Sequence, residues 1–466
     1  MDYDLIIIGS GPGGYVAAIR ASQLKMKVAV VERAELGGIC LNWGCIPTKS
    51  LLKSAQVFEY LTHASDYGIT ITGEVKPDFG AIISRSRSVA GGMSKGVQFL
   101  FKKNNIEHIK GIGRLVGSSN NIEVEVEAPD STRKMYSSKN IILATGARSK
   151  ELPNLKQDGE KIIGYREAMS LDKLPGSMVV VGSGAIGSEF ANFYQSLGTN
   201  VTLVEFLPRI VPVEDEEVSK QLERSFKKTG MKIMTSSTVE SVDTSKEKCQ
   251  VSIKTPKGLE IVEADIVLSA VGITTNIEDI GLENAGIKTD NGKVVVDDYY
   301  LTSVPGIYAI GDIVHGPALA HVASAEGIIC VEKIAGIDVD PLDYKNIPGC
   351  TYTTPEIASC GLTEAAAREA GYDIKVGKFP FTASGKASAA GAKDGFVKLI
   401  FDAAYGELLG AHMIGTNVTE MIAEIVVARK LETTAHEIIK SVHPHPTMSE
   451  AIMEAAAAAY GEVIHL

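Results

Sequence analysis

Four residues separate Cys40 from Cys45 in the segment GGICLNWGCIPTK. Along a straight helix, five positions rise about 7.5 Å, which exceeds the Cα separation of about 7 Å that a disulfide tolerates. Pro47 suits a first helical turn, so we expect a helix that starts near Ile46 and places Cys45 at its amino-terminal end, where a thiolate is stabilised. For the two thiols to pair, Cys40 would then have to precede that helix. The spacing leaves two possibilities open, a redox-active pair or two unrelated buried thiols.

A second candidate for chemistry is the segment HPHPTMSE at residues 443–450. A histidine such as His445 can act as a general base, and Glu450 could orient its imidazole ring. Thr447 and Glu450 also fit a capping box before an Ala-rich helix, which would be a purely structural role. The two roles are compatible, because one carboxylate can cap a backbone and hold an imidazole together.

A motif of the form GxGxxG occurs twice, each time between an apolar run and a helical pattern. Its glycines are Gly9, Gly11 and Gly14 in the first copy and Gly182, Gly184 and Gly187 in the second. An acidic residue follows each first glycine by 23 positions, Glu32 after position 9 and Glu205 after position 182. The first glycine makes a tight turn, the second lets the backbone approach a pyrophosphate, and the third lets helix and strand pack closely. Two copies with this spacing predict two dinucleotide sites, whereas one motif alone would be weak support.

The acidic residue that ends each repeat indicates which nucleotide fits. A glutamate here can accept a hydrogen bond from a ribose hydroxyl and disfavours a 2′-phosphate, so Glu205 favours NAD over NADP. Arg209, four residues further on, weakens this preference slightly. Two sites in one chain suggest two nucleotides that pass electrons between them. The alternative is a pair of glycine-rich turns without ligands.

The composition is that of a globular protein with several domains. The chain has 466 residues, of which 45% are hydrophobic and 22% are charged, and this excludes intrinsic disorder. The net charge of −11, from 46 basic and 57 acidic residues, argues against nucleic acid as a partner. No stretch reaches about 18 apolar residues and the start has no basic leader region, so we expect no membrane span and a cytoplasmic protein. The six cysteines are too few for a disulfide scaffold and form no metal site with histidines.

We expect an α/β protein with two Rossmann-like dinucleotide-binding domains followed by an α+β domain. The first would cover 1–145 and the second 146–272, because each nucleotide unit ends in an apolar run that stops at small residues. A central domain would cover 273–345 and contains another such run, which ends at Gly311-Asp312. From about residue 346 alternating strands mix with Ala-rich helices, so we expect a separate C-terminal domain over 346–466.

The cysteine segment between two dinucleotide motifs, together with HPHPTMSE, resembles the class I pyridine nucleotide-disulfide oxidoreductases, a flavin-dependent family. The resemblance covers essentially the whole chain. It implies FAD at the first motif, a redox disulfide between Cys40 and Cys45, and NAD at the second motif. It also implies that residues 273–345 complete the FAD site and that 346–466 form the dimerisation interface of a homodimer.

The resemblance assigns roles residue by residue. Cys40 would exchange with the substrate sulfur, and Cys45 would face the flavin as a thiolate charge-transfer partner. His445 would be the base, held by Glu450 and supplied by the partner subunit. The FAD residues would be Gly9, Gly11, Gly14, Glu32, Lys49, Gly113, Thr145, Gly146, Asp312 and Ala320. The NAD residues would be Gly182, Gly184, Ala185, Ile186, Gly187, Glu189, Glu205 and Gly272, with Glu189 also pairing with Lys49.

The implied reaction is the NAD-dependent oxidation of protein-bound dihydrolipoamide, without a metal. The implied partner is the lipoyl-bearing acyltransferase of 2-oxo acid dehydrogenase complexes, and the glycine cleavage system is a second candidate client. Within the family, a glutathione reductase would use NADPH and want basic residues where Glu205 stands. A mercuric reductase or a large thioredoxin reductase would carry cysteines near the C-terminus, and residues 461–466 contain none. The alternative of a different class is an assembly protein that binds nucleotides for structural reasons.

Four positions depart from the family pattern. Ile39 stands where Thr is usual, Trp43 is unusual between the cysteines, and Pro444 replaces a common Ala between the two histidines. The segment after Gly272 lacks an Arg that is frequent there. These departures bear on the tuning of the implied reaction rather than on its type.

Overall fold

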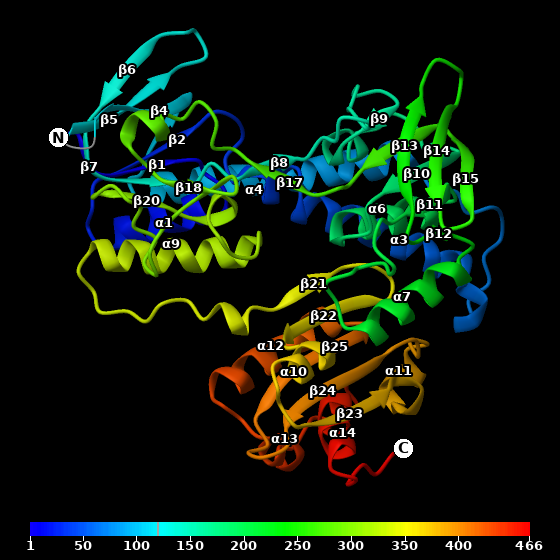
Figure 1. Cartoon of the computed structure of the whole chain (residues 1–466). Helices are drawn as coiled ribbons and strands as arrows, with labels where there is room; N and C mark the ends of the chain where they lie inside the picture. Colours follow the sequence, from blue (N-terminus) through cyan, green and yellow to red (C-terminus); the bar gives the residue numbers. More distant parts are fainter. Residues whose placement is uncertain (119–120) are drawn as a thin grey trace. The chain divides into compact units, whose positions relative to one another are not determined.

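The computed structural model describes residues 1–118 and 121–466, and the chain divides into two compact units (Figure 1). Unit 1 consists of Met1–Ser50, Ile83–Lys150 and Ile273–Tyr344. Unit 2 consists of Leu51–Ile82, Glu151–Gly272 and Lys345–Leu466. Each unit is therefore assembled from three separate stretches of the sequence.

The core of unit 1 is a five-stranded parallel sheet in the order β20-β7-β1-β2-β3. Its strands are β1 (Tyr3–Ile8), β2 (Val28–Glu32), β3 (Glu107–Lys110), β7 (Ser138–Leu143) and β20 (Ile307–Ala309). Residues 5–8 of β1 form a continuous apolar run because both faces of the strand are covered. Leu5 and Ile7 lie in one core with residues of α1 (Pro12–Gln23) and α9 (Ala320–Ile334), two helices that run side by side (Figure 1).

The opposite face of the same sheet is covered by a smaller antiparallel sheet. Ile6 and Ile8 share a core with Leu115 and Val124, which belong to β4 and β5. The strands of this sheet are β4 (Ile112–Ser118), β5 (Asn121–Glu127) and β6 (Arg133–Tyr136). The other elements with residues in unit 1 are α2 (Gly38–Asn42), α3 (Cys45–Thr62), α4 (Phe79–Lys103), β8 (Ala147–Ser149), β17 (Ile273–Thr275), α8 (Leu282–Ala285), β18 (Thr289–Asp290), β19 (Lys293–Val294) and η2 (Gly311–Ile313).

The first half of unit 2 repeats the plan of unit 1. Its parallel sheet has the order β12-β11-β10-β16-β9, and an antiparallel sheet of β13, β14 and β15 shares a core with it. The elements are β9 (Ile162–Ile163), α5 (Tyr165–Ala168), β10 (Ser177–Val181), α6 (Ala185–Ser196), β11 (Asn200–Val204), α7 (Glu216–Lys228), β12 (Lys232–Met234), β13 (Thr238–Asp243), β14 (Cys249–Thr255), β15 (Gly258–Ala264) and β16 (Ile266–Ser269). The segment β10-α6-β11 thus corresponds to β1-α1-β2, as the repeated motif predicts.

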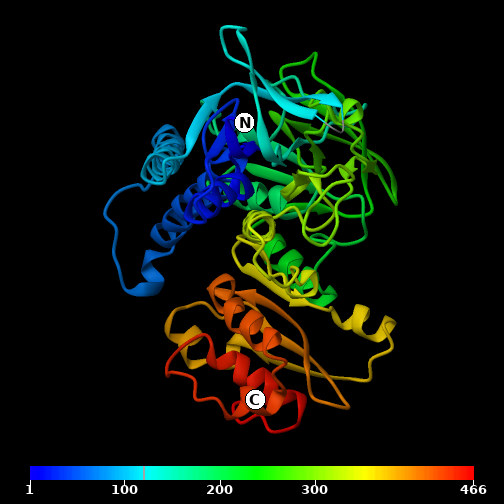
Figure 2. The ribbon, with the colours of Figure 1, turned by 90° about the vertical axis from the view of Figure 1, so that its left-hand side faces the viewer.

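The second half of unit 2 is an antiparallel sheet in the order β21-β22-β25-β24-β23. Helices α12 and α14, orange and red in Figure 2, share one core with this sheet. The elements are β21 (Gly349–Thr351), β22 (Glu356–Gly361), α10 (Glu364–Glu369), β23 (Ile374–Pro380), α11 (Gly385–Ala389), β24 (Phe396–Asp402), β25 (Leu408–Gly415), α12 (Val418–Lys430), α13 (Ala435–Lys440) and α14 (Glu450–Ala459). The predicted fold class, two Rossmann-like units and an α+β C-terminal domain, is confirmed. Across the described ranges, every helix is too short or too polar to cross a membrane.

A single buried lysine joins the two halves of unit 2. On β24, Val397, Leu399 and Phe401 face the core shared with α12 and α14, so the alternating Lys398 points to the other face. The Lys398 side chain is 2% exposed, and its Nζ lies 3.1 Å from Asp215, at the start of α7. Nζ also lies 3.0 Å from Glu217 and 2.7 Å from Glu364. Although burial lowers it, these carboxylates raise the pKa of Lys398, so the ammonium stays charged.

We expect Lys398→Met to destabilise the protein by about 3–5 kcal/mol, because it leaves the buried Asp215 carboxylate without its cation. The midpoint of urea unfolding measures this loss. The matched control is Lys378→Met: Lys378 is paired across the strands with Lys398 and contacts Glu217, but its side chain is 44% exposed. Such an exposed pair contributes about 0–1 kcal/mol. Equal midpoints for the two variants would contradict the prediction.

Glu214, the residue before Asp215, predicts a dependence of stability on pH. It is 7% exposed, its Oε2 has no hydrogen-bond partner among the described residues, and burial raises its pKa to about 7. Between the unfolded pKa of about 4.5 and the folded value, the native state holds a proton that the unfolded chain releases, so this group's contribution falls as pH rises.

We therefore expect Glu214→Gln to raise the free energy of unfolding at about pH 8 by roughly 1–3 kcal/mol. At about pH 5 the gain shrinks toward zero, because most of the native glutamate is already protonated there. Urea unfolding of both proteins at the two pH values measures the difference. A gain that is the same at both values would show that Glu214 does not titrate as its burial predicts.

Candidate active site

Each predicted nucleotide site is anchored by a glutamate that a serine of the glycine motif holds in place. In unit 1, one oxygen of Glu32 accepts hydrogen bonds from the Ser10 N–H at 2.9 Å and from its hydroxyl at 2.7 Å. In unit 2, Glu205 accepts the same pair from Ser183, at 2.8 and 2.6 Å. The other carboxylate oxygen accepts the backbone N–H two residues on, at 2.9 Å in unit 1 and 2.8 Å in unit 2. That oxygen keeps a lone pair for a ribose hydroxyl.

At the first and third glycines of both motifs, any larger residue would clash with the backbone. A Cβ on Gly9 would lie 2.2 Å from a carbonyl oxygen, and one on Gly14 would lie 2.0 Å from the Gly9 carbonyl. The corresponding distances in unit 2 are 2.4 Å for Gly182 and 1.9 Å for Gly187. The second glycine of each motif instead opens onto space, because a Cβ there would meet nothing within 4 Å. It is also the N-cap of α1 or α6, with nearly identical backbone angles, so each helix N-terminus fits a pyrophosphate.

Three further residues expected at FAD are Gly113, near the start of β4, and Thr145 and Gly146, just after the end of β7. Gly113 packs so tightly against the sheet that a Cβ would lie 3.1 Å from Val31. The Thr145 hydroxyl donates to the Asn276 carbonyl at 2.6 Å, and the Asn276 amide donates back to the Thr145 carbonyl at 3.0 Å. Gly146 follows with φ +68°, a left-handed backbone that favours glycine. These contacts fix the strand end where the chain leaves the sheet.

The other two FAD candidates lie around β20 and α9. Asp312 sits in the single turn η2 after β20, and burial raises its pKa. Glu326 of α9 fixes this turn: the residue is 1% exposed and accepts a hydrogen bond from the Gly311 N–H at 2.6 Å. Ala320 is the first residue of α9. All the FAD candidates therefore lie within unit 1.

The remaining NAD candidates lie on α6 and after β16. Ala185 and Ile186 form the first turn of α6, and Gly272 follows β16 with φ +116°. Glu189 is buried on α6, and its carboxylate accepts the Tyr352 N–H at 2.9 Å. Lys49, its expected partner, lies in the first turns of α3 in unit 1, so their pairing stays a prediction.

The two cysteines sit on two different helices. Cys40 lies in the short helix α2, and Cys45 is the first residue of α3, one position before the expected start. The thiols lie side by side: the hydrogen bond that the Cys40 thiol donates to Cys45, together with burial, raises the pKa of Cys40, while Lys49 lowers it. The segment abuts the first glycine motif, since a Cβ on Gly38 would lie 2.6 Å from the Gly11 Cα. The arrangement fits a redox pair next to a nucleotide rather than two unrelated thiols.

His445 and Glu450 form a hydrogen-bonded pair in unit 2. His445 Nδ1 lies 2.9 Å from Glu450 Oε1, and the His445 side chain is 78% exposed. Burial raises the pKa of Glu450, but the Thr447 N–H and the His445 ring outweigh it, so the pKa is lowered. The expected capping box is only half formed. Glu450 accepts the Thr447 N–H at 2.9 Å, but the Thr447 hydroxyl donates to the Pro444 carbonyl, and α14 begins at Glu450 itself.

Ser10 and Ser183 are functional residues that the sequence analysis missed. The sequence signal for them is that both motifs read GSG, with a serine between the first two glycines. Each serine also accepts a backbone N–H with its carbonyl and its hydroxyl: Gly37 contacts Ser10 at 3.1 and 3.2 Å, and Val211 contacts Ser183 at 3.2 Å in both cases. Each motif is thereby tied to the loop that comes after its glutamate.

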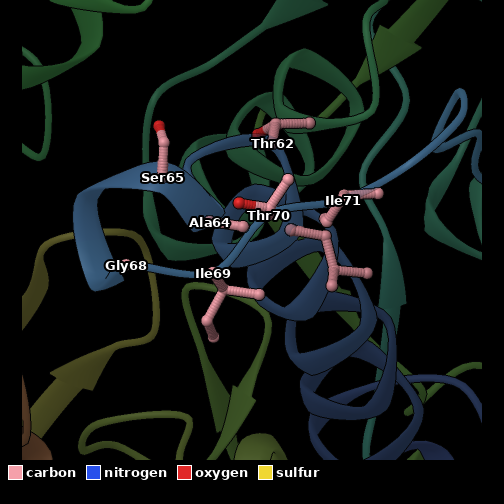
Figure 3. A pocket seen from close by; sticks show the side chains of 8 residues that line it. Thr62, Ala64, Ser65, Gly68, Ile69, Thr70 and Ile71 are labelled. Atoms are coloured by element: carbon pink, nitrogen blue, oxygen red, sulfur yellow. The ribbon is translucent and has the colours of Figure 1, made fainter.

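A separate hollow lies at the end of α3 and in the turn after it, over residues 61–71 (Figure 3). The side chains that line it are apolar or carry hydroxyl groups, and none is an acid, a base or a thiol. It therefore offers no groups for the chemistry of the cysteine pair. Across the ranges that the structure describes, His, Cys, Asp and Glu side chains also form no cluster that could hold a metal ion.

Comparison with known proteins identifies the family. The sequence profile of the pyridine nucleotide-disulphide oxidoreductases matches residues 3–327, and the profile of their dimerisation domain matches residues 347–456. The chain belongs to this family. Membership makes it an FAD- and NAD-dependent oxidoreductase, and the matched dimerisation domain supports a homodimer.

Relatives within the family indicate which of the family's reactions the chain resembles. The chain is 51% identical to dihydrolipoyl dehydrogenase of Rhizobium etli and 50% identical to that of Zymomonas mobilis, over 99% of each chain in both comparisons. The crystal structure of LpdA from Mycobacterium tuberculosis superposes with a TM-score of 0.91 at 28% identity, covering 97% of this chain and 98% of that one. The expected family and fold are therefore confirmed, and the chain resembles dihydrolipoyl dehydrogenases along its whole length.

Proposed function

We propose that this chain oxidises protein-bound dihydrolipoamide to lipoamide, with Cys40 and Cys45 as the redox pair and NAD as the final acceptor. The observation that carries the proposal is the placement of Cys40 in the short helix α2 and of Cys45 at the start of α3, against the first glycine motif. Thiols that exchange electrons with a substrate disulfide need this proximity and access to a nucleotide. Bound FAD and NAD would supply hydride transfer from the flavin to the nicotinamide.

The thiol chemistry follows from the pair. With Cys40 and Cys45 joined as a disulfide, a substrate thiolate attacks Cys40 Sγ and Cys45 leaves as a thiolate. The second substrate thiol gives up its proton and displaces Cys40, which closes the substrate disulfide. The pair then holds the two electrons that the substrate has lost. Cys45, at the N-terminus of α3, is the better-stabilised thiolate of the two positions.

His445 would accept the substrate protons. Its Nδ1 is held by Glu450, which leaves Nε2 as the nitrogen that can receive a proton. The His445 side chain is exposed in the single chain, which supports its delivery into the site of the partner subunit in the homodimer. Glu450, fixed in turn by the Thr447 N–H, would orient the ring.

The remaining sequence-based assignments stay predictions. They comprise the FAD and NAD contacts, the domain boundaries 1–145, 146–272, 273–345 and 346–466, and the cytoplasmic location. The lipoyl-bearing acyltransferase of 2-oxo acid dehydrogenase complexes is the partner that the proposed substrate implies. NAD rather than NADP is supported by Glu205, which accepts three hydrogen bonds as a carboxylate, and by Arg209, whose guanidinium lies 3.4 Å from the carbonyl of Pro212 in its own loop.

The decisive test mixes the purified protein with dihydrolipoamide and NAD and measures NADH formation. The paired control supplies NADPH and oxidised glutathione. Turnover in the first mixture and none in the control supports the proposal. Activity only in the control would overturn the assignment of NAD and move the protein to the glutathione reductases.

A further inference from the structure

Three consecutive residues of α4 hold the cysteine segment at three successive points. Arg87 donates from Nη2 to the carbonyl of Asn42, the last residue of α2, and its guanidinium lies 4.0 Å from the centre of the Trp43 ring. Ser86 is fully buried and donates to the Pro47 carbonyl at 3.0 Å. Arg85 donates to the Ser50 carbonyl at 2.9 Å. We call Arg85, Ser86 and Arg87 the α4 clamp.

The contacts of Arg87 fall on the link between the two cysteines. Asn42 to Gly44 is the short connection from α2 to α3, and the Trp43 ring is its only bulky side chain. An arginine at a helix C-terminus can bind a last carbonyl, and its planar guanidinium can also stack on an aromatic face. Arg87 does both, so it fixes the backbone and the side chain of the link together.

Redox chemistry makes this link the sensitive part of the segment. A disulfide holds its sulfurs about 2.05 Å apart, whereas two thiols or a thiol and a thiolate must separate to van der Waals contact. Each turnover therefore pushes Cys40 and Cys45 apart and pulls them together again. α2 is already fixed at its other end, because the Asn42 amide donates to the Leu36 and Gly38 carbonyls at 2.9 and 3.0 Å. Movement would then concentrate in the link, where Arg87 and Trp43 lie.

We propose that Arg87, stacked on Trp43, is a positioning residue that keeps the Cys40–Cys45 link in one conformation as the pair opens and closes. This inference rests on the proposed redox role of the pair. Arg87 acts through the backbone of Asn42 and the ring of Trp43 rather than by touching substrate. Ser86 and Arg85 hold the first turns of α3 and carry the structural part of the clamp.

The test compares Arg87→Met, Arg87→Lys and Trp43→Phe with the wild-type holoenzyme. Each protein is reduced anaerobically by two electrons with dihydrolipoamide, and the long-wavelength absorbance that a thiolate gives beside an oxidised flavin is measured per bound FAD. We expect Arg87→Met to lose most of this absorbance and to lower kcat roughly tenfold or more, since a misplacement of about 1 Å has such effects. Arg87→Lys restores part of it by binding the carbonyl without stacking, and Trp43→Phe retains most of it, because a smaller ring still accepts the cation.

Trp43 offers a second readout, because it is the only tryptophan in the sequence. Acrylamide should quench its fluorescence more in Arg87→Met than in the wild type, and more in the reduced than in the oxidised variant. Lys95→Met, which removes a cation from the same helix at a distance from the link in sequence, is the matched control and should change neither signal. If Arg87→Met does not fold, Trp43→Ala carries the test with the same expected losses.

The outcomes separate the two levels of inference. If the Cys45→Ser variant shows the same long-wavelength absorbance as the wild type, the proposed redox role itself is overturned. If Cys45→Ser loses the absorbance but Arg87→Met keeps both the absorbance and the kcat of the wild type, only the role of Arg87 is overturned. A loss in Arg87→Met that is accompanied by an equal loss of thermal stability and is not rescued by lysine would reduce Arg87 to a merely structural residue.

Discussion

A Cys45→Ser variant should lose NAD-linked oxidation of dihydrolipoamide by about 10⁴-fold or more, because removal of a covalent catalytic group leaves only binding effects. A serine hydroxyl cannot form or open a disulfide, so the substrate electrons have no acceptor in the protein. The segment should still fold, since α3 begins at this residue and a serine is well suited to the start of a helix. NADH formation, normalised to bound FAD, measures the loss.

The control for this variant is Cys350→Ser, a cysteine on β21 of the C-terminal domain. It should retain full turnover. The same experiment separates an enzyme from an assembly protein that binds nucleotides for structural reasons. A client complex that works equally well with the Cys45→Ser protein would favour the structural role, whereas loss of its activity supports catalysis.

A His445→Gln variant should lower kcat for dihydrolipoamide by about 10²–10⁴-fold, the usual contribution of a positioned general base. Glutamine keeps a polar side chain of similar size but cannot take up the substrate proton. Glu450→Gln should lose less, because the imidazole remains and only its orientation and charge stabilisation weaken. The pH profile of kcat/KM checks the assignment, since the limb that depends on deprotonation of the base should disappear in His445→Gln.

Two controls keep this prediction specific. His436→Gln alters an exposed histidine on α13 and should leave turnover unchanged. Reduction of the His445→Gln enzyme by NADH requires no substrate thiol, so its rate should stay at the wild-type value. Equal losses in both directions would contradict a role in thiol deprotonation and indicate damage to the nucleotide sites.

The fold was predictable because its determinants are local. Each βαβ unit is recognisable from its apolar strands, its three spaced glycines and its glutamate. All of these lie within about 25 residues of one another in the sequence. The same holds for the cysteine segment, where Pro47 placed the helix start to within one residue of the observed position. Thr447 shows the limit of such patterns, because its hydroxyl turned to a carbonyl three residues back rather than to the helix.

Other contacts were not predictable because they join residues that are distant in sequence. Lys398 reaches Asp215 across 183 positions, and nothing in the run FVKLIFD indicates that its lysine faces a buried acid. Arg87 meets Asn42 across 45 positions, and an arginine within a polar stretch of helix usually faces solvent. The roles of Lys398 and Arg87 can be recognised only once the structure shows which distant segments lie against each other.

The matching serine–glutamate anchors bear on how the protein tells its two nucleotides apart. FAD and NAD share an ADP half, and at the two predicted sites the anchors would present this half with the same carboxylate, the same serine donors and the same helix start. The ADP half therefore gives no basis for binding FAD selectively at one site and NAD at the other. The likeness between the two units ends just after the loop that binds the serine, where one chain segment enters the cysteine helices and the other enters α7. Selection must then reside in the segments beyond each anchor, so exchanging these two loops would be expected to confuse the sites, whereas exchanging the anchors would not.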